Sequence, residues 1–376
     1  MLHNTEICDD GIADEWAIRC EFWRAEADKS GGKRRVRERN SRPLILTGHG
    51  TSLRIENGAL SIKQGFTHYP QKAEQFRFFR GDLNLPRIIM LLDGSGSISF
   101  DVLNWLGEQG VALARIQWGG EPAVFASGAG FVGNPEKLRW QYEAQANEQL
   151  RLEFGRKLIC EKLRNSITTL ETRVPDTAFR ERAVAKANEA LAQLQAATLD
   201  NMSDVRAIEG ESAARYFSAW AGIEMQWTAA RRYPVPDDWR SYRSRSSILT
   251  GKKAKNWKAS HPINAMLNYA YAVRVAQLQV EAVADGFDPF AGIMHHSRPD
   301  FPAYAYDLIE PERPKVDAAI LGFAQGRKFS GADFVLRKDG VCRLSPQLAR
   351  AVAAAVAAGS PGSFHPRPLN AAFSRA

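Results

Sequence analysis

The segment at residues 261–317 places the strongest constraint on the fold, because it sets polar side chains at positions that a helix would bury. From His261 it reads H-P-I-N-A-M-L-N-Y-A-Y-A-V. Asn264, Asn268 and Tyr271 recur there at the spacing that brings side chains to one face of a helix. The segment therefore predicts a helix that carries one polar face among apolar residues.

Histidines and carboxylates follow in the same segment. His295 and His296 stand together in a short predicted loop, and Asp307 and Glu310 share a face of a later helical turn. Two carboxylates beside a histidine are costly to bury among apolar residues unless something compensates their charge. Because a divalent metal would do so, the segment is a candidate site for metal chemistry.

The earlier part of the chain, at residues 43–132, is predicted to be a small β domain. Apolar residues alternate on both sides of Asn57-Gly58, a dipeptide typical of a two-residue hairpin turn. One helix is expected to interrupt the strands at residues 99–108, with Ser99 as its N-cap.

Helical periodicity replaces the strand pattern from Pro135 onward. One or two long helices are expected at residues 135–172, another at 177–199, and a further one capped by Asp204. We therefore predict an α+β protein: a small N-terminal β domain followed by a larger all-α domain at residues 133–345. Residues 346–376 are expected to form a C-terminal tail that frays at its end.

Residues 1–42 form a predicted extension. Trp16, Phe22 and Trp23 suggest a short amphipathic helix whose apolar face needs a partner surface. A basic run at residues 33–42 is either a solvated linker or an arm that contacts a DNA backbone. We expect this extension to be dispensable for chemistry but to support assembly or DNA affinity.

Composition narrows the class of protein. The chain has 376 residues, enough for two domains, and a formal net charge of +8 that favours an anionic partner. Its four cysteines are scattered without a C-x-x-C pair, so zinc and disulfide frameworks are not expected. We expect a cytoplasmic protein, because no apolar segment has the length of a signal-peptide core or a membrane span.

Residues 230–260 combine positive charge with aromatic rings. Such a mixture suits contacts to phosphates together with stacking on bases, although a mobile solvated loop could have the same composition. The residues concerned are Arg231, Arg232, Arg240, Arg243, Arg245, Lys252, Lys253, Lys255 and Lys258, interleaved with Tyr233, Trp239, Tyr242 and Trp257. By contrast, the G-x-G-x-x-G at Gly128, Gly130 and Gly133 follows strands rather than opening a βαβ unit, which favours a hinge over a nucleotide site.

Four spaced motifs occur in order along the second half of the chain. They read I-E-G-x-x-A-x-x-Y-F at residues 208–217, P-x-N-x-x-L-N-Y-x-Y at 262–271, G-x-x-H at 292–295 and D-L-x-E-x-x-R-P at 307–314. Together they resemble CRISPR-associated protein one, the integrase family of CRISPR spacer acquisition. Lys162 and Asn165 also resemble a K-x-x-N of that family, and the resemblance covers roughly residues 43–345.

The resemblance implies the roles of individual residues in the larger, catalytic domain. Glu209, His295 and Glu310 would hold one Mg²⁺ or Mn²⁺, since oxygen ligands with one imidazole suit either ion. His295 rather than His296 fits the G-x-x-H spacing, and Asp307 would assist catalysis as a hydrogen-bonding partner of the ligands. The remaining assignments are to DNA binding: Arg240, Arg243 and Arg245 in the basic segment, Asn264, Asn268 and Tyr271 on the cavity floor, and Arg298 as a phosphate contact.

The reaction implied by the resemblance is attack of a DNA 3′-hydroxyl on a phosphodiester, which inserts a short double-stranded fragment into a CRISPR array. The family works as a homodimer formed through the β domain, and a dimer of the small CRISPR-associated protein two bridges two homodimers. Two alternatives stay open: a transposase-like integrase that needs no small partner, and a non-catalytic DNA-binding scaffold.

Two residues depart from the family pattern near the site. His261 stands where the family usually has an aspartate, and Pro311 directly follows Glu310. A proline there lacks the amide proton of a regular helix and is expected to end it.

Overall fold

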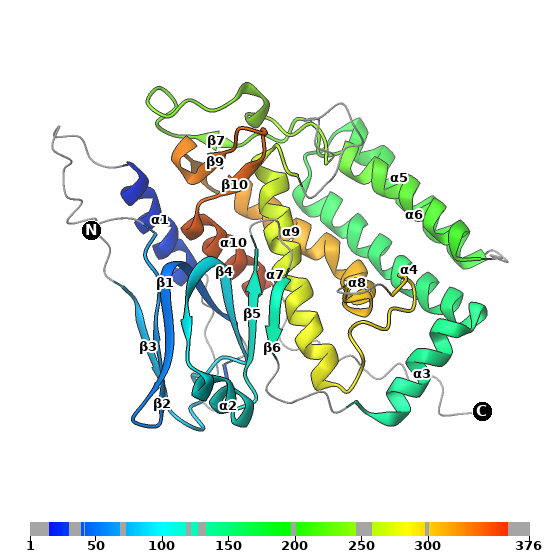
Figure 1. Cartoon of the computed structure of the whole chain (residues 1–376). Helices are drawn as coiled ribbons and strands as arrows, with labels where there is room; N and C mark the ends of the chain where they lie inside the picture. Colours follow the sequence, from blue (N-terminus) through cyan, green and yellow to red (C-terminus); the bar gives the residue numbers. More distant parts are fainter. Residues whose placement is uncertain are drawn as a thin grey trace.

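A sheet lies beside a larger assembly of helices in the computed structural model of the chain (Figure 1). The structure describes residues 15–29, 39–40, 42–67, 73–117, 122–126, 133–196, 201–245, 258–297 and 301–359. The N-terminal strands come first in the chain and the mostly helical part follows, which confirms the predicted α+β class.

The sheet has six strands in the order β3-β2-β1-β4-β5-β6. It is mixed, because β1 pairs in parallel with β4 and β4 with β5, whereas the other neighbours are antiparallel. Asn57 and Gly58 both take positive φ angles, 52° and 76°, as the predicted two-residue hairpin turn requires. The strands are β1 (Leu44–Glu56), β2 (Ala59–Lys63), β3 (Gln75–Phe78), β4 (Ile88–Ile98), β5 (Ala112–Ile116) and β6 (Pro122–Ala126).

Both faces of the sheet are covered, because apolar residues of its strands point alternately to opposite sides. On one face Ile89 packs in a cluster with Val102 and Trp105 of helix α2 (Phe100–Glu108). On the other face Ile88 and Met90 join the main core of the helical part. Helix α2 forms where it was predicted, but the Ser99 side chain makes no cap hydrogen bond.

The helical part begins with two helices separated at Asn147, whose side chain accepts hydrogen bonds from Gln149 N and Leu150 N and so caps the second. Asn201, rather than the predicted Asp204, caps the helix that carries Glu209. The helices are α3 (Pro135–Ala146), α4 (Glu148–Arg173), α5 (Ala178–Ala196), α6 (Met202–Ser218), α7 (Pro262–Ala284), α8 (Ala303–Ile309), α9 (Arg313–Gln325) and α10 (Pro346–Gly359), with a 3-10 turn η2 (Glu310–Glu312) between α8 and α9.

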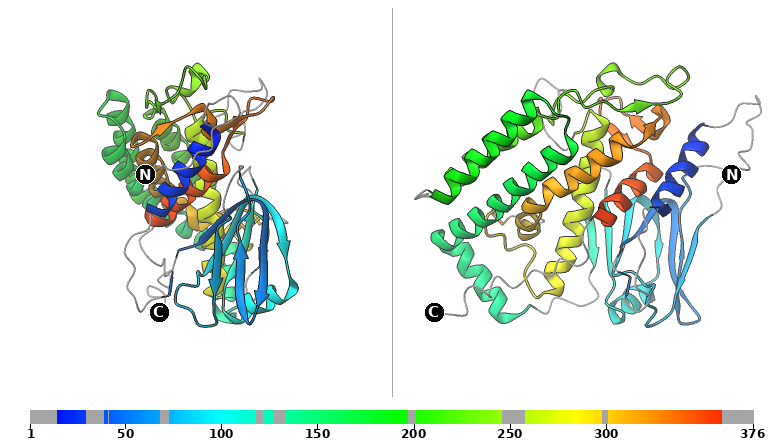
Figure 2. Two further views of the ribbon diagram at one scale, coloured as in Figure 1. Left: turned by 90° about the vertical axis from the view of Figure 1, so that its left-hand side faces the viewer. Right: turned by 180° about the vertical axis from the view of Figure 1, so that it is seen from behind.

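Helix α7 is buried on nearly all sides, between α8, α9, α10 and the sheet (Figures 1 and 2). The helical part also contains short strands and 3-10 turns: β7 (Gln226–Trp227), η1 (Asp237–Trp239), β8 (Lys328–Phe329), η3 (Gly331–Asp333), β9 (Phe334–Leu336) and β10 (Cys342–Leu344). Among the helices that the structure describes, none combines the length and the apolar character needed to cross a membrane.

The two segments predicted to lie outside the domains, at the N- and C-terminal ends, both contribute helices to the main core. Helix α1 (Glu15–Lys29) lies beside α10 (Figure 2), and Trp23 is fully buried against Phe323 and Phe329. Arg19 donates two hydrogen bonds to the buried carboxylate of Asp333. The apolar face of α1 therefore has the partner surface that it was expected to need. That residues 1–42 are dispensable for the chemistry stays a prediction, and most of the basic run lies outside the described residues.

The C-terminal boundary at residue 346 likewise falls at the start of a packed helix. Leu348, Val352 and Val356 of α10 are buried in the same core as Ile45 of the sheet. Gly128 and Gly130 lie outside the described residues, and α3 leads from Gly133 into the helical part rather than back to the sheet, as the hinge interpretation expects (Figure 1).

Candidate active site

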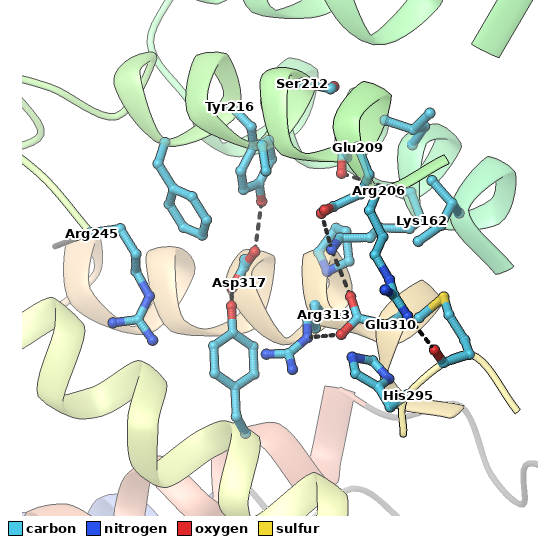
Figure 3. Close-up of a pocket in the computed structure, with 18 residues that line it drawn as sticks. Lys162, Arg206, Glu209, Ser212, Tyr216, Arg245, His295, Glu310, Arg313 and Asp317 are labelled. Carbon is cyan, nitrogen blue, oxygen red and sulfur yellow. Dashed lines mark hydrogen bonds and ion pairs between the residues drawn. The ribbon is translucent and has the colours of Figure 1, made fainter. Parts of the chain in front are cut away.

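A cavity of about 580 Å³ lies among α4, α6, α7, α9 and the loop before α8. The side chains that line it come from segments far apart in the sequence (Figure 3). Charged residues gather at one end and aromatic residues at the other. The charged end contains Lys162, Arg206, Glu209, His295, Glu310 and Arg313, and the aromatic end contains Tyr216, Phe217, Arg245, Tyr271 and Asp317.

Lys162 joins two carboxylates at the charged end. Its Nζ donates to Glu209 Oε1 at 2.5 Å and to Glu310 Oε2 at 2.6 Å. Arg313 Nε donates to the other oxygen of Glu310 at 2.8 Å. Burial alone would raise the pKa of Glu310, but the charges of Arg313 and Lys162 outweigh it and hold the pKa at about 2. Glu310 is therefore a buried carboxylate that stays ionised.

Pro311 sets the local backbone at Glu310. A regular helix would continue with an amide proton at residue 311, and proline has none. Helix α8 accordingly ends at Ile309, and the Glu310 amide bonds back to Asp307 O as in a tighter 3-10 turn. Asn165 of α4 donates to Pro311 O at 2.7 Å and fixes the turn against that helix. The predicted helix end is confirmed, and it leaves Glu310 facing Lys162.

Asp307 organises the loop that carries His295. Its carboxylate is inaccessible to solvent and accepts hydrogen bonds from the backbone amides of Ile293, Met294 and His295 at 2.6, 3.0 and 2.9 Å. It also bonds His295 Nδ1 at 2.7 Å. Because a carboxylate accepts hydrogen bonds, Nδ1 is the donor of this pair, which leaves Nε2 as the ring nitrogen that could bind a metal. Asp307 does not line the cavity, so its contribution is to position His295.

Helices α3 and α6 hold the same loop from two sides. Gln141 Nε2 donates to Asp288 O at 2.7 Å and Ala291 O at 2.8 Å. Gln145 Nε2 reaches Gly292 O at 2.9 Å, and Arg206 of α6 donates to Met294 O at 2.7 Å. These contacts fix the histidine loop from neighbouring helices.

Asp317 is a second buried carboxylate, at the aromatic end. It accepts hydrogen bonds from the hydroxyls of Tyr216, at 2.9 Å, and of Tyr271. Burial raises its pKa to about 6, against the opposing effect of the two phenols. Arg313 and Arg245 lie 4.9 and 5.8 Å from the centre of the Tyr271 ring, which places positive charge over its face.

Of the three polar residues on one face of α7, only one reaches the cavity. Tyr271 lines it, but Asn264 donates to Ser244 O at 2.8 Å and Asn268 accepts from Arg245 Nη2 at 2.9 Å. The expectation that both asparagines line the cavity floor is wrong, because they hold the segment before the cavity and thereby aim Arg245.

His261, which stands where the family usually has an aspartate, caps helix α7. Its Nδ1 accepts from the Ile263 amide at 3.1 Å at the start of α7. Burial lowers the pKa of His261 to about 4, so the ring is neutral at neutral pH.

The donor set suits a hard divalent cation. Two carboxylates reach one point, now held by the Lys162 ammonium group, and an imidazole with a free Nε2 lines the same cavity. In the part of the chain that the structure describes, however, no three His, Cys, Asp or Glu side chains already stand close enough to enclose a metal. Binding to all three residues therefore requires a local rearrangement.

The family model of the CRISPR associated protein Cas1 matches residues 44–358. The chain belongs to the Cas1 family. A CRISPR-associated endonuclease Cas1 of Methanospirillum hungatei is 26% identical over 321 residues, covering 83% of this chain and 86% of that protein. A Cas4 exonuclease/Cas1 endonuclease fusion of Rhodospirillum rubrum is 32% identical over 57% of this chain, which spans only 34% of the fusion's length.

Solved structures show the same fold. A casposase bound to integration product has a TM-score of 0.66 and 23% identity, covering 85% of this chain and 82% of that one. A Cas1 protein from Thermotoga maritima has a TM-score of 0.58 and 14% identity, with coverage of 81% and 84%. A chain of a Cas6-RT-Cas1–Cas2 complex has a TM-score of 0.61 and 17% identity over 86% of this chain and 32% of its own length.

The basic and aromatic segment of this Cas1 family member divides by burial. Arg240 and Arg243 are exposed and lie 3.2 and 3.1 Å from Asp237 and Asp238. Two of the interleaved aromatics do not share that exposure: Trp239 and Tyr242 are core residues and cannot stack on a base. Residues 246–257, with Lys252, Lys253, Lys255 and Trp257, lie outside the described residues, as does Arg298.

Sequence reasoning missed several residues that build the site. Lys162 was noticed only as part of a motif, and Asp317, Gln141 and Arg206 were not singled out. None has a local signature: a glutamine on an amphipathic helix reads as surface, and only the fold brings Asp317 to Tyr216, 101 residues away. Gly210, in the motif that carries Glu209, has no close neighbour outside its own helix: among the described residues no such atom lies within 4 Å of the position a Cβ would take there.

Proposed function

We propose that this chain is a metal-dependent DNA integrase and endonuclease that inserts short DNA fragments into a CRISPR array. The observation that carries the proposal is the convergence of Glu209 and Glu310 on one point beside His295, in a chain of the Cas1 family. Relatives named Cas1 endonucleases and the fold shared with a casposase bound to integration product support it.

Glu209, His295 and Glu310 would hold one Mg²⁺ or Mn²⁺. When bound, this ion would polarise the scissile phosphate and stabilise the charge on the oxygens that enter and leave. Asp307 keeps the His295 Nε2 available, and Arg313 keeps Glu310 ionised. Asp307 of α8 thus orients His295, and Arg313 of α9 orients Glu310 of η2.

The reaction exchanges one phosphodiester for another. The 3′-hydroxyl oxygen of the incoming fragment bonds to phosphorus, the bond to the target strand's 3′-oxygen breaks, and the proton passes from the attacking hydroxyl to the departing oxygen through solvent. With water as the attacking group the same site cleaves DNA. Arg206, Arg245 and Arg313 line the cavity and would neutralise the phosphates on either side of the reacting bond.

Double-stranded DNA and a small Cas2 partner are the proposed partners, with the chain acting as a homodimer. Part of a chain in a Cas6-RT-Cas1–Cas2 complex has this fold, which supports the proposal. Arg240 and Arg243 are exposed and would bind the DNA backbone at the rim. If they do, replacing both with glutamine should flatten the slope of log affinity against log salt by about 0.9 for each phosphate that an arginine no longer neutralises. An unchanged slope would place the DNA elsewhere.

A strand-transfer assay tests the proposal. A short duplex with free 3′-hydroxyls is incubated with a plasmid that carries a CRISPR repeat, with and without Cas2, in Mg²⁺, in Mn²⁺ and in EDTA. We expect covalent joining that EDTA abolishes. Lack of joining and of cleavage under every condition would favour the DNA-binding scaffold instead.

The casposase likeness gives a second candidate, a transposase-like integrase that acts without the small partner. The same assay separates the two, because integration that is equally efficient without Cas2 supports the transposase-like function.

A further inference from the structure

Lys162 occupies the point on which the candidate metal ligands converge. Its Nζ lies 2.5 Å from Glu209 Oε1 and 2.6 Å from Glu310 Oε2, and only 16% of its side chain is exposed. Any cation that takes an oxygen from both carboxylates at that point must displace the ammonium group, because two positive charges cannot share it.

We propose that Lys162 is an exchangeable counter-ion, which a divalent cation displaces from Glu209 and Glu310 and which then binds a phosphate of the DNA in the cavity. The inference rests on the proposed function, since it takes the two carboxylates as metal ligands. It assigns to Lys162 a positioning role before the cation enters and a substrate contact afterwards.

The charge balance of the site makes the exchange depend on DNA. Hydrogen bonds join the carboxylates of Glu209 and Glu310 to the cationic groups of Lys162 and Arg313, so the charges of these four groups balance. Arg206, which lines the same cavity, adds a further positive charge. A divalent cation added beside these partly buried groups leaves an excess of positive charge in the site. Phosphodiester anions remove that excess, and DNA should therefore tighten cation binding.

The cavity gives the Lys162 side chain room for a second position. Lys162 lines a cavity of about 580 Å³, and its four-carbon stem can swing the ammonium group while α4 stays fixed. Arg313 cannot move as easily, because its guanidinium group is held between Glu310 and the Tyr271 ring. Lys162 is thus the cation of the cluster that is able to exchange.

The test measures Mn²⁺ binding to the full-length protein by electron paramagnetic resonance of the free ion, with and without a short DNA duplex. The variants are Lys162→Met and, as a matched control, Lys157→Met, which removes an exposed lysine of the same helix. Thermal unfolding checks that each variant is folded.

Removing the competing ammonium group should strengthen Mn²⁺ binding in the absence of DNA. A neighbouring opposite charge changes the proton affinity of a carboxylate by about one to three powers of ten, so we expect Kd to fall at least about tenfold in Lys162→Met. DNA should tighten Mn²⁺ binding to the wild type at least about fivefold, within the usual range of coupling between sites. That coupling should shrink in Lys162→Met and persist in Lys157→Met.

A folded Lys162→Met variant with unchanged or weaker Mn²⁺ binding would overturn the inference while leaving the metal centre intact. Absence of Mn²⁺ binding in the wild type and in Lys162→Met alike would overturn the proposed function itself. If Lys162→Met does not fold, nitrogen NMR of the lysine ammonium groups in the wild type decides. The Lys162 signal should shift on saturation with Mg²⁺ and DNA, and a signal that stays unchanged at saturation would contradict the exchange.

Discussion

Two buried carboxylates stand at opposite ends of one cavity and have opposite electrostatic surroundings. Glu310 and Asp317 lie two helical turns apart along η2 and α9, and both are almost inaccessible to solvent. Glu310 is held by the charged groups of Lys162 and Arg313, and its pKa lies at about 2. Asp317 is held by two neutral phenols, and its pKa rises to about 6.

The difference shows that burial alone does not make a carboxylate a ligand. Both groups lose about the same solvent, so the charge of the hydrogen-bond donors decides which form is stable. Cationic donors keep Glu310 ionised, which is the form that would bind a metal. Asp317 instead accepts hydrogen bonds from the neutral phenols of Tyr216 and Tyr271, which fix it in place. The charged end is therefore suited to chemistry and the aromatic end to support.

Replacing each carboxylate by its amide should break the comparison most clearly. Glu310→Gln removes a proposed ligand, and we expect strand transfer to fall by more than the roughly 10- to 100-fold that loss of an outer partner typically costs. Asp317→Asn should cost less, because it alters only the hydrogen bonds that hold Tyr216 and Tyr271. Turnover measured under single-turnover conditions in Mn²⁺ compares them, and equal losses would mean that the two ends do the same work.

Asp307→Asn should have the next largest effect, although the residue does not reach the cavity. An amide cannot accept from three backbone amides and from His295 Nδ1 together, so the histidine loop loses its anchor. We expect Mn²⁺ affinity to fall about 10- to 100-fold. Asp339→Asn, at an exposed aspartate, serves as control; unaltered Mn²⁺ affinity in Asp307→Asn would show that His295 is not a ligand.

The pH dependence of stability should reveal the aromatic end. Asp317 has a pKa of about 6 in the folded protein and an ordinary value of 3.8 when unfolded. Its folded form therefore binds the proton more tightly, and its contribution to stability is present below about pH 4 and lost as the pH rises to about 6. Asp317→Asn should remove that loss, on the order of 1 kcal/mol per pH unit in the free energy of unfolding. Urea denaturation at several pH values measures it, and parallel profiles would contradict the raised pKa.

Tyr216→Phe should give the smallest effect and the sharpest separation of the two ends. It removes one donor to Asp317, for a loss of about 1 kcal/mol in the free energy of unfolding. Mn²⁺ affinity should stay within twofold of the wild type, on the order of the error of such measurements. A large loss of Mn²⁺ affinity would show that the aromatic end shapes the metal site directly.

Local signals in the sequence were enough for part of the fold. Asn57-Gly58 predicts its hairpin because only a few residues tolerate positive φ, and Pro311 ends α8 because it lacks an amide proton. Glu209, His295 and Glu310 could be singled out because spaced motifs carry them, and the fold brings all three to one cavity. Their role as ligands stays a prediction.

The rest depends on contacts between distant segments. The sequence predicts that Trp23 needs a partner surface, but only the fold shows that this surface is the core beside α10. The sequence predicts that Trp239 and Tyr242 stack on bases because they stand among arginines, but both are buried in the core. The bridge from Lys162 to Glu310 spans 148 residues, and no local pattern could have predicted it.

The central claim is that Glu209, His295 and Glu310 share one divalent ion. Pulsed electron paramagnetic resonance of the Mn²⁺-loaded protein tests it most directly, because an imidazole ligand gives a nitrogen coupling at the ion. We predict one such coupling in the wild type, its loss in His295→Ala and its persistence in His296→Ala. A coupling that survives in His295→Ala, or that is absent from a wild type loaded with Mn²⁺, would contradict the account.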